Sequence, residues 1–301
     1  INNKKMKKLI LYTFLFSISF STAQKKELRN ANKFFTSGEY ASAIDLLDSS
    51  KEIFDSSDDK IKSQAMLLYG KLHTAMEDFE LAMNAFDMSK SLGISDQLLN
   101  PEISKLETAL ITSAVGDNET ENFSSAAKKL KMVYDLNKDN NEEYLFYAAS
   151  SAVNSLDYPL ALEYYEILRD IKYEGIETKF YITEVSSGNE IEINSETEFK
   201  LLQKSKDYMN PREEETESKF PEIVKNIALI YTELGQNDKA LAAIEAARSS
   251  NPDDVGLIIT AANIYFELDN KEAFKLAMSE AIEKEPNNPV LYYNLGVVSG
   301  E

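Results

Sequence analysis

The sequence predicts an all-α protein built of stacked helical hairpins and interrupted once by a small β-hairpin and helix. Three observations support this fold class. Glycine and proline number only 10 and 7 in 301 residues, so long helices meet few breakers. Two proline-containing turns recur at a fixed interval, which is the signature of a repeat architecture. The helical pattern fails in one segment, where apolar and polar residues alternate as in a strand.

The repeat is clearest near the C-terminal end. Residues 251–254 (NPDD) and 285–288 (EPNN) are matching turns whose prolines lie 34 residues apart. Counting Pro252 as position 32 makes Pro221 position 1 of a unit. Gly235 then falls at position 15, where the first helix must end and the chain must turn. Small residues occupy positions 8, 20 and 27, where two helices approach closely; they are Ala228, Ala240 and Ala247.

The same pattern extends in both directions and gives about seven units, the last one cut off. The next unit keeps Ala262, Tyr265, Met278, Ala281 and Pro286 in register. Earlier units are marked by Ala31, Phe34, Gly38, Tyr40 and Ala43; by Gly70, Phe79, Ala82 and Phe86; by Phe123, Ala126 and Leu130; and by Ala149, Tyr158, Ala161 and Tyr165. Because proline is costly inside a helix, all seven prolines should lie at helix starts or in turns. Pro101, Pro221 and Pro289 are expected to open helices, and Pro211 to lie in a turn.

The interruption lies between the fourth and fifth units. Residues 178–185 and 190–194 alternate apolar and polar side chains around a four-residue loop, which predicts a β-hairpin. Ser195 and Glu198 form a capping box that opens a helix to about Tyr208. The acidic stretch 212–218 is interpreted as a linker back to the repeats. Since an isolated hairpin is marginal in water, we expect this one to pack on its own repeats or on a partner.

The N-terminal residues have the pattern of an export signal. Lys7 and Lys8 precede an apolar run, and small residues follow it as a cleavage site before Gln24. The run of twelve residues is shorter than the roughly 20 that a spanning helix needs. We therefore expect a signal peptide, an exported chain and no stable membrane insertion after cleavage.

The 34-residue period and the residues at its fixed positions resemble the tetratricopeptide repeat (TPR). This resemblance implies an α-solenoid, a right-handed superhelix of helical hairpins. Four repeats, an insert and a second repeat block after a signal ending in Ala-Gln look like secreted TPR proteins of Bacteroidetes-type bacteria. The expected domains are a signal peptide at 1–23, an N-terminal TPR block at 24–173, the hairpin, helix and acidic linker at 174–220, and a C-terminal TPR block at 221–301.

The resemblance also implies where a partner would bind. In TPR arrays the first helices line a concave groove, and positions 2, 5, 9, 12 and 13 read a bound peptide. The partner-binding residues predicted in this way are Lys225, Asn263, Phe266, Glu267 and Tyr293. The clamp for a C-terminal carboxylate that some cytosolic TPR domains carry is absent, because Leu229, Tyr293 and Val297 stand at three of its polar positions.

No motif for catalysis, a cofactor or a metal is found. His73, the single histidine, falls at position 11 of its repeat, where later repeats carry tyrosine, so it is interpreted as a packing residue. Asp135 begins a segment like a calcium loop, but Asn140 and Phe146 replace the required glycine and glutamate. Cysteine is absent, and no phosphate-binding, zinc-protease or hydrolase motif occurs. We predict a protein that is not an enzyme.

Charge narrows the choice of partners. The formal net charge is −19, and removal of residues 1–23, with four lysines and no acid, lowers it to −23. Such a surface repels nucleic-acid phosphates and anionic lipids. Partners are therefore expected to be proteins or peptides that are basic or apolar, and not nucleic acid.

Three hypotheses for function follow. The first is a non-catalytic scaffold of the periplasm or cell envelope that binds proteins through the concave groove. The second is the N-terminal recruiting region of a longer envelope enzyme or sensor. The third is self-association through the exposed last repeat, whose first helix ends the sequence without a capping helix.

Overall fold

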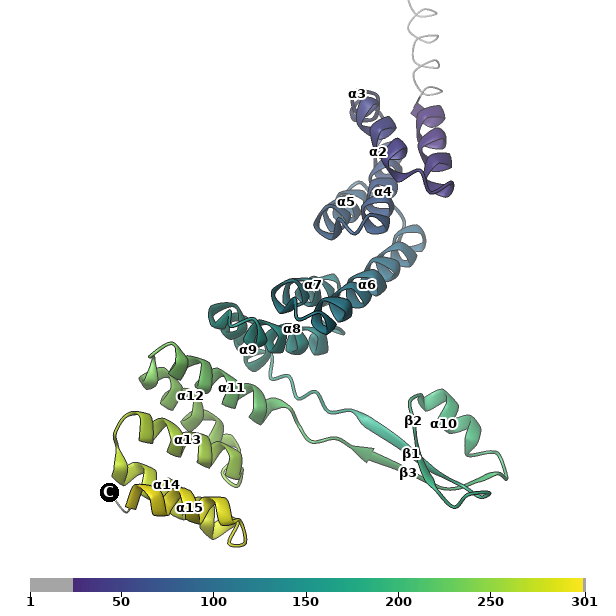
Figure 1. Cartoon of the computed structure of the whole chain (residues 1–301). Coiled ribbons are helices and arrows are strands. Elements are labelled where there is room, and N and C mark those ends of the chain that lie inside the picture. Colours follow the sequence, from purple (N-terminus) through teal and green to yellow (C-terminus); the bar gives the residue numbers. More distant parts are fainter. Residues whose placement is uncertain (1–23, 300–301) are drawn as a thin grey trace, which may run out of the picture. The chain divides into compact units, whose positions relative to one another are not determined.

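The computed structural model describes residues 24–299 (Figure 1). The chain divides into two compact units, residues 1–116 and 117–301, each described by itself below. Both units consist of helical hairpins, and the second also contains a three-stranded sheet. The predicted all-α fold with a small β insert is therefore confirmed. The predicted signal peptide, residues 1–23, lies outside the described residues.

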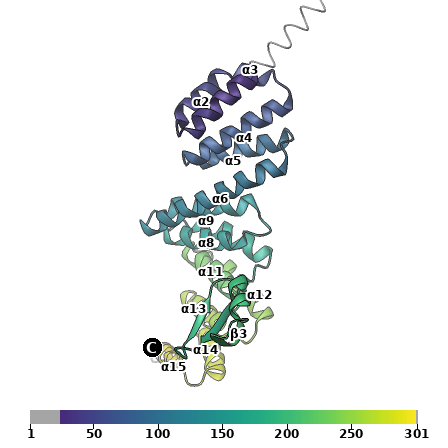
Figure 2. The ribbon, with the colours of Figure 1, turned by 90° about the vertical axis from the view of Figure 1, so that its right-hand side faces the viewer.

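Unit 1 contains two helical hairpins and most of the next helix. In the second hairpin, α4 and α5 lie side by side along their length (Figure 2). Gly70 of α4 permits this close contact, because a Cβ atom there would lie 2.3 Å from the Phe86 ring of α5. The helices are residues 24–36, α2 (Tyr40–Ser49), the short α3 (Lys51–Asp55), α4 (Asp59–Ala75), α5 (Phe79–Ser91) and α6 (Asp96–Glu119), whose last turn belongs to unit 2.

Unit 2 also consists mainly of consecutive helical hairpins. Its hairpins pair α8 with α9, α11 with α12 and α13 with α14, and α15 packs on α14. The helices are α7 (Phe123–Leu136), α8 (Glu142–Asn154), α9 (Tyr158–Asp170), α11 (Phe220–Glu233), α12 (Asn237–Ser250), α13 (Val255–Glu267), α14 (Lys271–Lys284) and α15 (Pro289–Ser299).

The turn inside each hairpin has one repeated geometry. One residue adopts a positive φ, and the N–H of the next residue bonds to the carbonyl five positions back, as in a Schellman motif. Asp78 N–H donates to the His73 carbonyl at 2.9 Å, and Gln236 N–H to the Tyr231 carbonyl at 2.7 Å. Glycine adopts a positive φ with the least strain, yet only two of the six turns have glycine at this position. The six residues are Gly38, Glu77, Glu121, Leu156, Gly235 and Asp269, with φ between 55° and 77°.

Small residues lie at the helix contacts where the 34-residue count places them. Ala228 and Ala240 of the fifth repeat are fully buried, and Ala247 is 4% exposed. Ala31 and Ala43 occupy the corresponding sites of the first repeat and are also fully buried. A methyl group lets two helix backbones approach while still excluding water. The repeat register read from the sequence is thus the register of the helices.

The insert differs from its prediction in one strand. Residues 208–215 form a third strand, where the sequence suggests the end of a helix and an acidic linker. The strand order is β2-β1-β3, with both pairs antiparallel. One face of the sheet is covered by α10 through a small cluster of Ile182, Ile193 and Phe199. The elements are β1 (Thr178–Glu184), β2 (Glu190–Ile193), α10 (Glu196–Leu202) and β3 (Tyr208–Glu215).

Pro211 lies within β3 and not in the expected turn. It falls at a bulge, because Tyr181 pairs with Arg212 but Thr183 pairs with Met209, leaving one extra residue on β3. Asn210 in this bulge has a φ of 52°. An edge strand tolerates proline at a bulge, since the missing N–H is not required by the ladder.

Pro101 does not open its helix either. It lies inside α6, which begins at Asp96. The Ser95 carbonyl accepts bonds from the N–H groups of Leu98 and Leu99, so the first turn forms upstream of the proline. The expected helix start is therefore wrong by about one turn.

Helices on the two sides of the insert are in direct contact. Helix α11 packs directly on α9, although the whole insert lies between them in sequence. Tyr231 of α11 donates a hydrogen bond to Glu166 of α9 at 2.8 Å, and Asn226 donates to the Tyr165 hydroxyl at 3.1 Å. The compact units divide at residue 116, within α6.

Candidate binding groove

A hollow of about 270 Å³ brings three of the five predicted site residues together. Asn263 and Phe266 come from α13, and Tyr293 comes from α15. Phe266 is 50% exposed and Tyr293 is 72% exposed, although α13 buries most of its other apolar side chains. The rest of the lining is Phe274, Asn294 and Val297.

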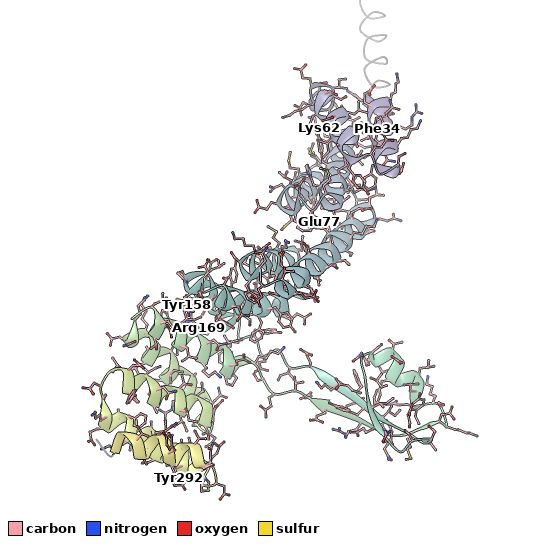
Figure 3. The ribbon with its side chains drawn as sticks, in the orientation of Figure 1. Phe34, Lys62, Glu77, Tyr158, Arg169 and Tyr292 are labelled. Carbon is pink, nitrogen blue, oxygen red and sulfur yellow. The ribbon has the colours of Figure 1, made fainter. Side chains whose placement is uncertain are left out.

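The aromatic wall of this hollow is held by packing. The Phe266 ring lies 5.8 Å from the ring of Phe274, which is itself 3% exposed and belongs to the cluster beneath. Tyr292, the neighbour of Tyr293 on α15, donates its hydroxyl to the Pro286 carbonyl at 3.0 Å (Figure 3). Apolar area is therefore presented on a surface whose order does not depend on a ligand.

Lys225 and Glu267 are not part of the lining of this hollow. Lys225 is half-buried on α11, one repeat away, and Glu267 is exposed at the last residue of α13. Both residues stay predictions as binding residues. Their position in the repeat places them on the first-helix face, but the hollow is closed by α13, α14 and α15 alone.

A second hollow, of about 340 Å³, lies on the same kind of face between α8, α9 and α11. Its floor is the Tyr165 hydroxyl, which is within 3.2 Å of Ser150 Oγ and accepts from Asn226 at 3.1 Å. Burial raises the pKa of Tyr165 by more than these two hydrogen bonds lower it. The hydroxyl therefore stays neutral at physiological pH. Glu222 and Glu233 lie at its rim.

Ser150 and Asn226 were not among the predicted site residues. Ser150 occupies position 9 of its repeat, so the count that found Asn263 also identifies it. Asn226 occupies position 6, which the groove positions leave out. Asn226 lines the hollow because it contacts Tyr165 of the preceding repeat. The spacing of residues within one repeat does not predict a contact of this kind.

The residues considered for chemistry are engaged in packing or ion pairs. The His73 ring stacks on Tyr69 with centroids 6.2 Å apart, and its Nδ1 lies 3.4 Å from an Asp78 oxygen. Lys131 donates to Asp135 at 2.6 Å. Within the described residues, no three histidine or carboxylate side chains are grouped as a metal site would require.

None of the helices among the described residues combines the length and apolar character needed to cross a membrane.

Residues 226–254 match the family model of the tetratricopeptide repeat. This match supports the TPR family. It begins in α11 and ends at the turn before α13, so it covers most of the fifth repeat. No curated protein sequence matches the chain.

Solved structures with a similar fold share little sequence with this chain. MamA from Desulfovibrio magneticus RS-1 is 14% identical, with 64% of this chain and 82% of that chain covered and a TM-score of 0.40. PilF of Pseudomonas aeruginosa is 10% identical, with 93% and 99% covered and a TM-score of 0.37. PilW, a type IV pilus biogenesis factor, is 10% identical, with 91% and 98% covered and a TM-score of 0.42.

Proposed function

We propose that this protein is a non-catalytic scaffold of the cell envelope that binds partner proteins or peptides through the first-helix face of its repeats. The observation that supports this most is the hollow of Asn263, Phe266 and Tyr293. Two exposed aromatic rings beside an amide provide apolar area for a side chain and a hydrogen-bonding group for a peptide backbone. The TPR match at residues 226–254 agrees with a protein-binding role.

The expected partner of this face is basic or neutral and apolar. The groove positions of unit 2 carry several carboxylates, among them Glu143, Glu222, Glu233 and Glu267. Opposite charge on a partner would speed association and select against acidic partners. Location in the envelope rests on the export pattern of residues 1–23, and the TPR proteins of Bacteroidetes-type bacteria that the chain resembles support it.

The test is an affinity capture from native envelope extract, comparing the tagged chain with the double variant Phe266→Ala/Tyr293→Ala. Loss of both rings should weaken partner binding by about 1–2 kcal/mol, because exposed aromatic anchors contribute most of the energy of such an interface. The melting temperature should fall by no more than a few degrees, since Phe266 and Tyr293 are 50% and 72% exposed.

A matched control is Leu276→Ala/Val290→Ala. These side chains are also exposed, at 74% and 59%, but do not line the hollow. Proteins retained by the control and lost from the aromatic variant would be identified by mass spectrometry, and their affinities measured with purified components. Equal affinity for both variants would show that this hollow is not the binding site.

A further inference from the structure

The first-helix face of unit 1 differs in charge from the rest of this acidic protein. The chain has 51 acidic residues, yet none of the groove positions of unit 1 carries one. These positions hold Lys25, Leu28, Asn32, Phe35 and Thr36 in the first helix, Gln64, Leu67, Lys71, Thr74 and Ala75 in α4, and Thr108, Ile111 and Val115 in α6. In unit 2 the same positions include at least four glutamates.

Three cations gather around one hollow of this face. Lys25, Arg29 and Lys71 line a cavity of about 330 Å³ between the helix at 24–36 and α4, with no carboxylate in the lining. Asn32 and Gln64 add two amide groups. The remaining lining consists of the three leucines Leu28, Leu67 and Leu68. Cations, amides and apolar area therefore occur within one concave surface.

Lys71 is fixed in position but not neutralised. Its ammonium group lies 4.8 Å from the centroid of the Phe35 ring and 3.8 Å from Glu102. Glu102 is bound more closely by Lys105, which contacts both of its oxygens at 3.1 Å. The carboxylate is thus shared by two lysines, and one positive charge in this group remains available to a ligand.

We propose that the first-helix face of unit 1 is a second binding site, which takes an acidic peptide segment with apolar side chains between its carboxylates. Carboxylates would pair with Lys25, Arg29 and Lys71, and the amides would bond to the peptide backbone. The distant acidic residues of the chain oppose binding of an acidic peptide only weakly, because salt screens charges beyond about 8 Å at physiological ionic strength. A nucleic acid is disfavoured, since the ring of Phe35 is covered by Lys71 and offers no stacking platform.

The experiment measures fluorescence anisotropy of a labelled decapeptide of alternating glutamate and leucine, titrated with the full chain. Binding is expected to weaken with added salt and to be at least about tenfold weaker for the glutamine–leucine and lysine–leucine peptides. The variant Lys25→Gln/Arg29→Gln/Lys71→Gln should lose at least about tenfold in affinity. Circular dichroism at the same concentration verifies that the variant is folded.

The matched control is Lys51→Gln/Lys60→Gln/Lys90→Gln, which changes net charge by the same amount at exposed lysines outside the hollow. It should bind the acidic peptide as the unmodified chain does. Equal loss in both variants, no preference over the glutamine peptide, or full competition by a single-stranded oligonucleotide would each overturn the proposal. The Phe266→Ala/Tyr293→Ala variant should bind the acidic peptide normally, so failure here and failure of the proposed function are distinguishable.

Discussion

At the scale of single residues, the hairpin turns show where the sequence departs from its own local preference. Leu156 adopts a φ of 61° in the turn between α8 and α9, and its side chain is 70% exposed. A β-carbon in the left-handed region costs about 1–2 kcal/mol, and here no burial offsets it. The fold holds this residue there because the carbonyl of Ala152 must accept the N–H of Asp157 to end α8.

Leu156→Gly should therefore raise the free energy of unfolding by about 0.5–1 kcal/mol, the relief of backbone strain being partly offset by greater freedom of the unfolded chain. Urea denaturation followed by circular dichroism measures it. Leu156→Ala is the control, because it removes the same exposed apolar surface but keeps the β-carbon. Equal stabilisation by both variants would assign the effect to the side chain and not to the backbone.

Another residue-scale feature is the ion pair of Asp117 and Lys129, 2.6 Å apart, in unit 2. Burial tends to raise the pKa of Asp117, but hydrogen bonds from Lys129, Ser125 and Asn122 outweigh it and hold that pKa below its usual value. Since the folded-state pKa lies below the unfolded one, the stabilisation is complete above the unfolded pKa of about 4 and is lost as pH falls through the folded value.

Lys129→Met keeps most of the aliphatic chain and removes the charge. It should destabilise unit 2 by about 1–2 kcal/mol at neutral pH, and the difference from the unmodified chain should shrink below about pH 4. Thermal unfolding at a series of pH values between 7 and 3 provides the measurement. Lys128→Met, at the exposed neighbouring position, should have little effect at any pH. A destabilisation that does not change with pH would attribute the loss to packing of the lysine stem.

At the scale of elements, the insert is a small domain with its own core. Its two connecting segments are joined at the base, where Thr216 N–H donates to the Glu177 carbonyl at 2.9 Å and Glu177 N–H donates to the Thr216 hydroxyl at 2.9 Å. On the sheet face opposite α10, the Arg212 guanidinium lies 4.3 Å from the Tyr181 ring centroid and pairs with Glu190. The main contacts of its strands are with one another and with α10, so stability of the repeats should not depend on them.

Replacement of residues 179–214 by Asn-Gly tests this independence. Thr178 and Glu215 are direct antiparallel partners, so a two-residue turn can connect them without strain. The shortened chain should keep its helical circular dichroism and melt within a few degrees of the full chain. Phe199→Ala, which removes the centre of the insert cluster, should likewise leave the melting of the helices unchanged. Unfolding of unit 2 in the deletion variant would show that the insert supports the repeats.

The insert also contains one element that the sequence pattern did not predict. Strands β1 and β2 and the start of α10 follow from alternation and a capping box, and they form where those signals place them. Strand β3 has no such signal, because nearly all of its side chains are exposed and four of its eight residues are charged. It forms by pairing with β1, and pairing between segments thirty residues apart has no local pattern to reveal it.

At the scale of the whole molecule, the repeat count predicted the helices well because one spacing constrains many residues at once. Every helix pair from residue 24 to residue 284 follows the same order of buried small residue, left-handed turn and buried aromatic or aliphatic residue. The candidate site could be predicted from the sequence only as far as position in a repeat brings residues to one hollow, as it does for Asn263, Phe266 and Tyr293. It was not predictable where it depends on contacts between repeats, as for Asn226, or on the gathering of charge in unit 1.

The contact of α9 with α11 across the insert has a consequence for the order of folding. The entropic cost of closing a loop rises by about 0.6 kcal/mol for each doubling of the loop's length. Two helices separated by roughly fifty free residues therefore come together more slowly than two helices joined by a short turn. Pairing of β1 with β3 brings Thr178 and Glu215 together and shortens the remaining free connection to about a dozen residues. We therefore expect formation of the sheet to speed the docking of the fifth repeat on the fourth.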